Sequence, residues 1–183
     1  MEDRKIMALG FFDGVHRGHA ALLHRAKALA EQHGLSAEAV SFSTHPSAVL
    51  EGKSVPLLST EAERRQLIEA LGIGVRFLPF DEAMRTTPWD TFLAQRLEDG
   101  AAGFVVGYDF RFGYRGEGEA EKLGRWCAER GLLFEKVEAV LQGGQPISSS
   151  RIRKLLAEGN VAEARELLGH DLRSMNEKEE GSP

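Results

Sequence analysis

The sequence predicts an α/β fold with a doubly wound, mostly parallel sheet of five strands and helices on both faces. Three observations lead to this fold class. Five short apolar segments alternate along the chain with segments whose apolar residues recur at helical spacing. Glycine residues stand at most of the boundaries between them. Short buried strands joined by helical connections form parallel sheets that helices cover on both faces.

The predicted strands are short and apolar, as strands buried on both faces are. They are residues 5–9, 39–42, 75–80, 104–106 and 133–140. Gly10 and Gly107 directly follow the first and the fourth strand. Because ligands bind such sheets at the carboxyl ends of the strands, we expect a site in the loops after the first, second and fourth strands.

The predicted helices lie between the strands and close the chain. They cover about residues 18–33, 61–71, 88–99 and 119–131, followed by two short helices separated at 159–160. The second begins with a capping-box pattern, Thr60-Glu61-Ala62-Glu63, and Pro88 suits the first turn of the third. We expect residues 44–58 to be a loop.

Size and composition indicate one globular domain, which we place at residues 1–175, with 176–183 as a disordered tail. The chain has 183 residues, of which 42% are hydrophobic and 28% charged, and a net charge of −5. That charge argues against a general nucleic-acid binder. Neither a bilayer-spanning segment nor a signal peptide is evident, and the single cysteine, Cys127, fits a reducing compartment. We therefore expect a cytoplasmic protein without nucleic-acid or membrane partners.

The segment after the first strand, which we call the histidine loop (residues 10–19), has the composition of a phosphate-binding loop. It reads Gly10-Phe11-Phe12-Asp13-Gly14-Val15-His16-Arg17-Gly18-His19. Glycines permit close backbone approach, a helix start offers free N–H groups, and histidines donate hydrogen bonds to phosphate oxygens, more strongly when protonated. Two alternatives stay open from the residues alone: a tight turn with surface histidines, or a histidine pair that binds a metal.

A second candidate phosphate site lies near the end of the chain. The serine–arginine segment (residues 147–154) reads Ile147-Ser148-Ser149-Ser150-Arg151-Ile152-Arg153-Lys154. Hydroxyl groups, an arginine and a helix N-terminus together suit an anion. The alternative is an ordinary helix start, capped by serine and followed by solvated basic residues.

The aromatic loop (residues 107–113) follows the fourth strand and reads Gly107-Tyr108-Asp109-Phe110-Arg111-Phe112-Gly113. Aromatic side chains could enclose a flat ring system while polar groups read its edge. The alternative is a loop stabilised by its own aromatic residues, with Asp109 in an Asx turn.

Taken together, these segments resemble a known family. The histidine loop resembles the His-x-Gly-His signature of the nucleotidyltransferase superfamily, and the serine–arginine segment resembles its Ile-Ser-Ser-Thr-x-Ile-Arg motif, with Ser150 in place of threonine. The aromatic loop resembles the Gly-x-Asp-Phe-x-Phe-Gly segment of bacterial FAD synthetases. The resemblance implies a Rossmann-like nucleotidyltransferase fold and an FMN adenylyltransferase, which transfers an adenylyl group from ATP to FMN.

The resemblance also assigns roles to residues. It implies that His16, His19 and Arg153 are catalytic, and that together with Arg153 the two histidines supply positive potential. The implied ATP-binding residues are Gly10, Phe11, Phe12, Gly14, His16, Gly18, His19, Ser149, Ser150 and Arg153. The implied FMN-binding residues are Asp13, His45, Pro46, Asp109, Phe110 and Phe112. Thr44 stands where the family usually has proline, and Asp13 could instead orient the histidine loop or stabilise its turn.

The implied reaction needs Mg²⁺ with ATP, for which we name no protein ligand, and uses FMN as substrate and FAD as product. The resemblance ends at Gly169, so we expect no riboflavin kinase domain, and a separate riboflavin kinase would supply FMN. Two other functions stay open: transfer to a different phosphorylated acceptor, and flavin or nucleotide binding without catalysis. The adenylyl-transfer hypothesis requires the segments around His16 and Arg153 to meet, with the loop of Asp109 facing them.

Overall fold

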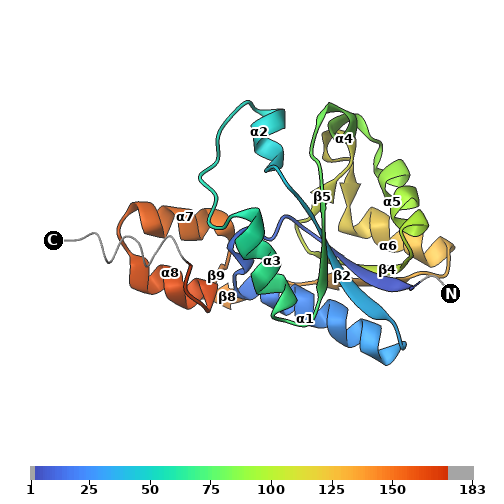
Figure 1. Cartoon of the computed structure of the whole chain (residues 1–183), viewed down its shortest axis with the longest axis horizontal. Coiled ribbons are helices and arrows are strands. Elements are labelled where there is room, and N and C mark those ends of the chain that lie inside the picture. Colours follow the sequence, from blue (N-terminus) through green and yellow to red (C-terminus); the bar gives the residue numbers. More distant parts are fainter. Residues whose placement is uncertain (1–2, 173–183) are drawn as a thin grey trace.

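The predicted fold class is confirmed by the computed structural model of the chain, which describes residues 3–172 (Figure 1). Its main sheet has five parallel strands in the order β3-β2-β1-β4-β7. These strands are β1 (Lys5–Leu9), β2 (Ser36–Phe42), β3 (Gly74–Leu78), β4 (Ala101–Gly107) and β7 (Leu133–Val137). The predicted tail, 176–183, lies outside the described residues.

Helices cover both faces of this sheet. α1 (Arg17–Gln32) and α3 (Glu61–Glu69) pack with residues such as Ile6 and Val105 on one face. On the other face, α5 (Trp89–Glu98) and α6 (Ala120–Glu129) pack with residues such as Met7 and Phe104. The alternation of Ile6 and Met7 between the two cores follows the two-residue period of a strand. None of the described helices is long and apolar enough to cross a membrane.

A helical pair at the end of the described chain forms a third core beside the sheet (Figure 1). α7 (Ser149–Ala157) and α8 (Val161–Leu168) pack against each other through Ile152 and Leu167, and Leu58 joins them from the segment before α3. This arrangement brings the end of the described chain to the carboxyl edge of β1. It thereby places residues far apart in the sequence around the histidine loop.

Several elements differ from the prediction. The loop expected at 44–58 contains α2 (Pro46–Leu50), and α4 (Glu82–Thr86) follows β3. The glycine-rich segment after β4 holds two short strands, β5 (Arg111–Phe112) and β6 (Gly118–Glu119), which pair with each other, and a 3₁₀ turn between them, η2 (Tyr114–Gly116). β7 stops at Val137 because its neighbour β4 stops at Gly107, and a hairpin of β8 (Leu141–Gln142) and β9 (Gln145–Pro146) follows.

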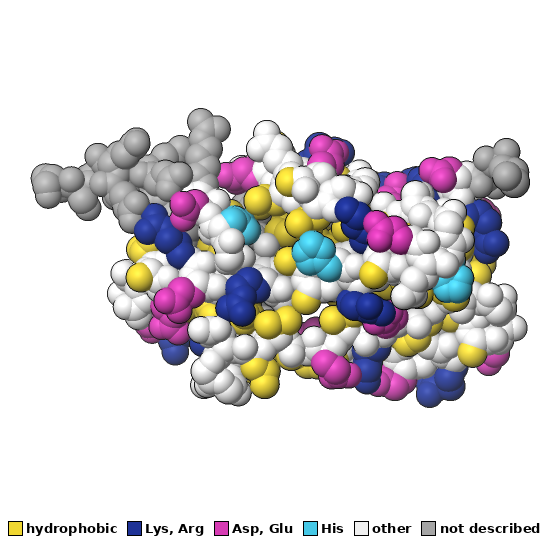
Figure 2. Space-filling view, turned by 90° about the horizontal axis from the view of Figure 1, so that it is seen from below, with side chains coloured by type: hydrophobic (Ala, Val, Ile, Leu, Met, Phe, Trp, Pro, Cys, Tyr) yellow, Lys and Arg dark blue, Asp and Glu magenta, His cyan; other side chains and the backbone are white. Residues whose placement is uncertain are grey.

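The surface carries mixed charge. On the face seen from below Figure 1, acidic and basic side chains alternate over the whole area, with apolar atoms between them (Figure 2). Pairs such as Arg25 with Glu135 and Lys136 with Glu121 neutralise one another locally. This face therefore shows charge of both signs and no extended area of a single sign.

Candidate active site

The candidate site lies where the sheet changes winding direction. β1 is flanked by β2, which follows it in the chain, and by β4, which follows a crossover, so a crevice opens between the loops after β1 and β4. A cavity of about 240 Å³ occupies this position. The histidine loop, Asp109 and Phe110 of the aromatic loop, and Ser148 and Ser149 line it together. The structure thus brings the three predicted segments to one cavity.

The histidine loop has an unusual backbone. Phe12, Gly14 and Val15 all have positive φ angles, of 60°, 77° and 43°. Such angles suit glycine, but for a phenylalanine and especially for a β-branched valine they carry strain of about 1–3 kcal/mol each. Residues 13–15 form a 3₁₀ turn, η1 (Asp13–Val15), before α1 begins. Strain of this kind persists only where neighbouring groups hold the loop in place.

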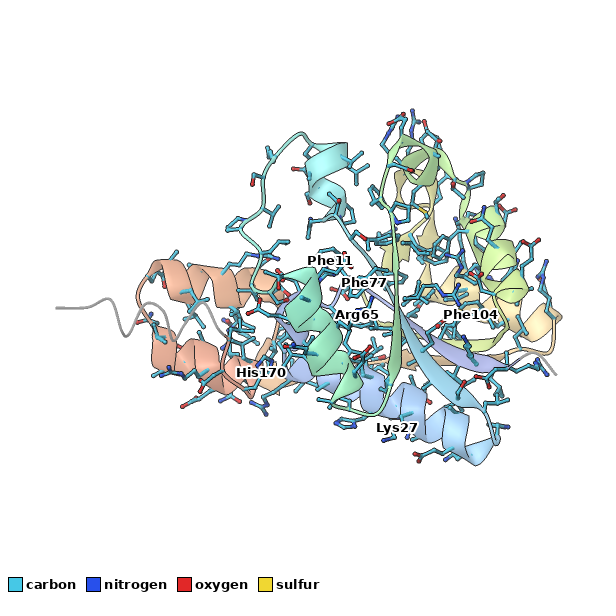
Figure 3. All side chains as sticks on the ribbon, viewed as in Figure 1. Phe11, Lys27, Arg65, Phe77, Phe104 and His170 are labelled. Atoms are coloured by element: carbon cyan, nitrogen blue, oxygen red, sulfur yellow. The ribbon has the colours of Figure 1, made fainter. Side chains whose placement is uncertain are left out.

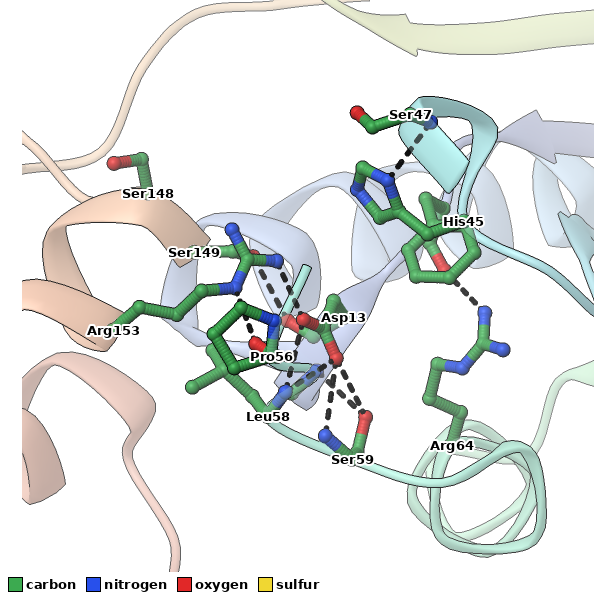
Figure 4. Close-up of polar contacts among 12 residues, drawn as sticks. Asp13, His45, Ser47, Pro56, Leu58, Ser59, Arg64, Ser148, Ser149 and Arg153 are labelled. Atoms are coloured by element: carbon green, nitrogen blue, oxygen red, sulfur yellow. Dashed lines mark hydrogen bonds and ion pairs between the residues drawn. The ribbon is translucent and has the colours of Figure 1, made fainter. Parts of the chain in front are cut away.

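Asp13 is the main anchor of the loop, and it is almost fully buried, with 2% exposure (Figure 4). Its carboxylate accepts hydrogen bonds from the backbone N–H groups of Leu58 and Ser59, each at 3.0 Å. Nη2 of Arg153 lies 2.7 Å from its Oδ2. Of the roles considered for Asp13, these contacts favour orientation of the histidine loop. Its implied contact with FMN stays a prediction.

His16 and His19 are stacked, with ring centroids 3.5 Å apart and planes 16° from parallel. Nδ1 of His16 accepts a hydrogen bond from the backbone N–H of His19 at 3.2 Å, so His16 caps the N-terminus of α1. An acceptor at Nδ1 places the proton on Nε2. The stack therefore offers N–H donors beside a helix N-terminus, an arrangement suited to phosphate oxygens.

The histidines of the site are neutral at pH 7. Burial lowers the pKa of His16 to about 4, although Asp13 acts in the opposite direction. Burial, followed by the charge of His16, also lowers the pKa of His19 well below its ordinary value. The expectation that these histidines supply positive charge therefore needs correction, because desolvation outweighs the neighbouring carboxylate. Both are neutral rings, each with one N–H that can donate a hydrogen bond.

The serine–arginine segment starts α7 beside the histidine loop. Ser148 caps the helix by accepting from the N–H of Arg151, and Oγ of Ser149 donates to the carbonyl oxygen of Asp13 at 2.9 Å. Arg153 joins Asp13 and also donates from Nε to the carbonyl oxygen of Pro56 at 2.9 Å. Ser150 is exposed and lines a neighbouring groove instead of the cavity with the histidines. Its contact with ATP stays a prediction.

The aromatic loop contributes unevenly to the cavity. Asp109 and Phe110 line it, whereas Phe112 is buried in the core and stacks beneath Phe110, with ring centroids 5.6 Å apart. Phe112 thus supports the ring of Phe110. The FMN contacts implied for all three residues stay predictions.

His45 and Pro46 start α2, outside the cavity lining. Nδ1 of His45 accepts from the N–H of Ser47, and Pro46 occupies the first helical position. The His45 ring meets the edge of Phe11, with centroids 4.7 Å apart. Burial, aided by the charge of Arg153, lowers the pKa of His45. Both residues stand beside the histidine loop through Phe11, and their flavin contacts stay predictions.

Arg64 of α3 is a residue that the sequence analysis missed. Its side chain is fully buried beneath the site and lies over the Phe11 ring at 4.1 Å; Phe11 and Phe77 are labelled in Figure 3. It donates to the carbonyl oxygens of Phe11 at 2.9 Å and Phe42 at 3.0 Å, which joins the ends of β1 and β2. A signal was present: Arg64 precedes Ile68 by one helical turn and so falls within the apolar stripe of α3.

Ser59 is a second missed residue, and its sequence context gave no signal. Its hydroxyl accepts from the N–H of Gly14 at 2.8 Å and lies 3.2 Å from Oδ1 of Asp13. A Cβ on Gly14 would lie 3.0 Å from side-chain atoms of Leu58. Segment 58–59 therefore packs directly on the strained turn. Within residues 3–172, no cluster of three or more His, Cys, Asp or Glu side chains could hold a metal ion.

Comparisons with known proteins agree with this geometry. A model of the FAD synthetase family matches residues 1–151. The chain is 35% identical over 176 residues to the bifunctional riboflavin kinase/FMN adenylyltransferase of Listeria monocytogenes, covering 91% of this chain and 54% of that protein. It is 30% identical over 169 residues to the protein of the same description from Escherichia coli K12, covering 90% of this chain and 54% of that protein. The chain thus spans about half the length of these curated relatives.

A solved structure supports the fold. A crystal structure described as a macrolide-efflux protein from Streptococcus pneumoniae has a TM-score of 0.81 and 27% sequence identity to this chain. The similarity covers 94% of this chain and 58% of that one. This match supports the fold, and the family match over residues 1–151 shows the family: the chain belongs to the FAD synthetase family.

Proposed function

We propose that this chain transfers the adenylyl group of ATP to FMN and so forms FAD and pyrophosphate. One observation carries the proposal. A single cavity at the ends of β1 and β4 is lined by the histidine loop, the start of α7 and the aromatic loop. Family membership and the description of the curated relatives support the same reaction. The adenylyltransferase domain in this proposal is residues 1–175.

The triphosphate of ATP binds between the histidine loop and α7. Nε2–H of His16 and the His19 ring donate to phosphate oxygens, and Ser149, Ser150 and Arg153 complete the set. The other proposed nucleotide contacts of the loop are Gly10, Phe11, Phe12, Gly14 and Gly18, of which all but Gly14 line the cavity. In this arrangement Arg153 divides its donors between Asp13 and the phosphate, which its five N–H groups permit.

The chemical step is an in-line displacement. A phosphate oxygen of FMN attacks the α-phosphorus of ATP, a new P–O bond forms, and the bond to the β-phosphate oxygen breaks to release pyrophosphate. The attacking oxygen is already anionic, so the step needs no general base. The protein contributes position and stabilisation of the charge that develops on the transferred group. Neutral imidazole donors suit this role because they need no proton exchange.

FMN binds on the side of the aromatic loop. Asp109 and Phe110 line the same cavity as the two histidines, and Phe112 packs beneath Phe110. Asp13, His45 and Pro46 complete the proposed flavin contacts from the loops after β1 and β2. Aromatic walls with a few polar groups are suited to a flat, polar-edged ring system.

Magnesium enters this site with ATP. Mg²⁺ prefers oxygen ligands and keeps several waters, so phosphate oxygens and water would hold it, and it would supply neutralisation of charge on the triphosphate. We propose that the reaction takes place in the cytoplasm. Because FMN is consumed, phosphorylation of riboflavin must precede it; a separate riboflavin kinase is the proposed source.

The test is incubation of the purified chain with ATP, MgCl₂ and FMN, followed by chromatography and a pyrophosphate assay. FAD and pyrophosphate should form in equal amounts. Riboflavin, which lacks the attacking phosphate, is the matched negative control. Pyrophosphate release with a different phosphorylated acceptor, or with CTP in place of ATP, would replace the proposed substrates. Binding of FMN and ATP without pyrophosphate release would contradict catalysis.

A further inference from the structure

We propose that His170 is a positioning residue that holds the histidine loop in the shape needed for catalysis. The inference rests on the proposed adenylyl transfer. His170 lies beyond residues 1–151, which the family model matches, and outside the three motif segments. In Figure 3 it stands where the end of α8 meets the start of α1.

The contacts of His170 are aimed at the strained part of the loop. Its Nε2 lies 2.8 Å from the carbonyl oxygen of Gly14 and 3.2 Å from that of Val15. Carbonyl oxygens only accept, so Nε2 must carry a proton to donate to Gly14 and Val15, while Nδ1 lies 3.1 Å from the carbonyl oxygen of Asp171. Gly14 and Val15 are also two of the residues with positive φ, at 77° and 43°. The imidazole therefore holds the peptide groups whose conformation carries the strain.

The C-terminal end of α8 positions the imidazole of His170. α8 ends at Gly169, whose φ of 78° reverses the backbone, and the N–H of Gly169 bonds to the carbonyl oxygen of Arg165 at 2.8 Å. Leu168 packs so close to the turn that a Cβ on Gly14 would lie 3.2 Å from its Cδ2. The same short segment thus contacts one turn of the histidine loop through both apolar packing and a hydrogen bond.

Three segments that are distant in the sequence hold the strained turn in place. Ser59 and Leu58 hold it from the start of α3, Ser149 and Arg153 from α7, and His170 from the end of α8. His16 directly follows the turn, so a change in the peptide planes at Gly14 and Val15 moves the His16–His19 stack. Displacement of catalytic groups by about 1 Å can cost on the order of a hundredfold in rate.

The side chains of glutamine and asparagine give a matched test. The amide nitrogen of glutamine follows Cβ by the same number of bonds as Nε2 of histidine, whereas that of asparagine corresponds to Nδ1. His170→Gln can donate to the Gly14 carbonyl, and His170→Asn cannot reach it. His24→Ala removes an exposed histidine of α1 and serves as the control.

Steady-state kinetics of FAD formation by the full chain provide the main measurement. We expect His170→Asn to lower kcat roughly 10- to 100-fold, with the KM for FMN changed less than about twofold. His170→Gln should recover most of the lost kcat, and His24→Ala should match the wild type. Equal kcat values for the asparagine and glutamine variants, whether high or low, would overturn the inference.

A second measurement does not depend on turnover. The N–H of Val15 donates to the carbonyl oxygen of Phe12 at 3.0 Å within the turn. Its hydrogen exchange should be faster in His170→Asn than in His170→Gln or His24→Ala. Unchanged exchange would refute the positioning role. Failure of the wild-type chain to make FAD would instead count against the proposed function, while the exchange rates would still decide the role of His170.

Discussion

The histidine loop and the aromatic loop stand at neighbouring strand ends, yet they are built differently. The histidine loop is buried and strained, and remote segments fix it through hydrogen bonds. The aromatic loop is held by aromatic packing, such as Phe110 on Phe112, and leaves Tyr108 42% exposed. Under the proposed function, the comparison indicates that the side assigned to adenylyl transfer has a fixed geometry. The side assigned to the acceptor has a looser frame.

The first prediction concerns the stacked histidine pair of the histidine loop. His19→Ala removes one donor from the stacked pair, and removal of a single donor to a developing charge typically costs about 100- to 1000-fold in rate, or roughly 3–4 kcal/mol. We expect kcat for FAD formation to fall by that amount, with little change in the unfolding midpoint. His24→Ala is the control. Near-normal turnover of the His19 variant would remove it from the catalytic set.

The second prediction concerns the acid stability of the same side. Because burial lowers the pKa of His16 from 6.5 to about 4, the unfolded chain binds a proton in this interval more readily than the folded chain does. Stability present above pH 6.5 is therefore lost as the pH falls towards 4. Between pH 7 and 4, the unfolding free energy of the wild type should fall by roughly 3 kcal/mol more than that of His16→Asn.

Asparagine suits this comparison because it caps helices well and its side-chain oxygen can replace Nδ1 of His16. Urea unfolding at several pH values provides the measurement. Parallel pH profiles for the two proteins would show that His16 is protonated equally easily in the folded and unfolded chains.

The third prediction tests the strained turn through its packing. Gly14→Ala adds a Cβ at φ 77°, 3.0 Å from Leu58, whereas Gly143→Ala adds one at φ 63° with no atom within 4 Å. Both substitutions carry the cost of positive φ, so their difference reports the packing alone. We expect Gly14→Ala to lose about 1–3 kcal/mol more unfolding free energy than Gly143→Ala. Equal losses in urea unfolding would mean that the turn yields to the new methyl group.

The fourth prediction concerns the aromatic loop. Asp109→Ala should raise the KM for FMN about tenfold, which corresponds to loss of one well-placed polar contact of about 1.4 kcal/mol. The KM for ATP should change much less. Initial rates at varied concentrations of each substrate test this difference. A parallel rise in both KM values would indicate that Asp109 shapes the cavity as a whole.

Local patterns were predicted well from the sequence. The capping box at Thr60 and Glu63 forms as expected, since both of its hydrogen bonds lie within one helical turn. The five strands were also found, because each apolar run is continuous in the chain. β2 is longer than predicted, starting at Ser36, since polar Ser36 and Glu38 pair with β1 in the sheet.

Features that depend on contacts between distant segments could not be predicted from local patterns. The histidines were identified by their motif, but their neutral state follows from burial by segments far away in the sequence. Asp13 was found, yet its partners Leu58, Ser59 and Arg153 could not be read from spacing. α2 escaped notice because a histidine side chain, and not a serine or aspartate, caps it.

The buried guanidinium group of Arg64 has a consequence for redesign of the protein. By bonding to the carbonyl oxygens of Phe11 and Phe42, it couples the end of β1 to the end of β2. A segment grafted after β2 from a relative, intended to admit a new acceptor, would also shift the histidine loop, because the same guanidinium bonds to both. Such a chimera would have to import α3 together with the graft, because the helix and the two loops form one transferable unit.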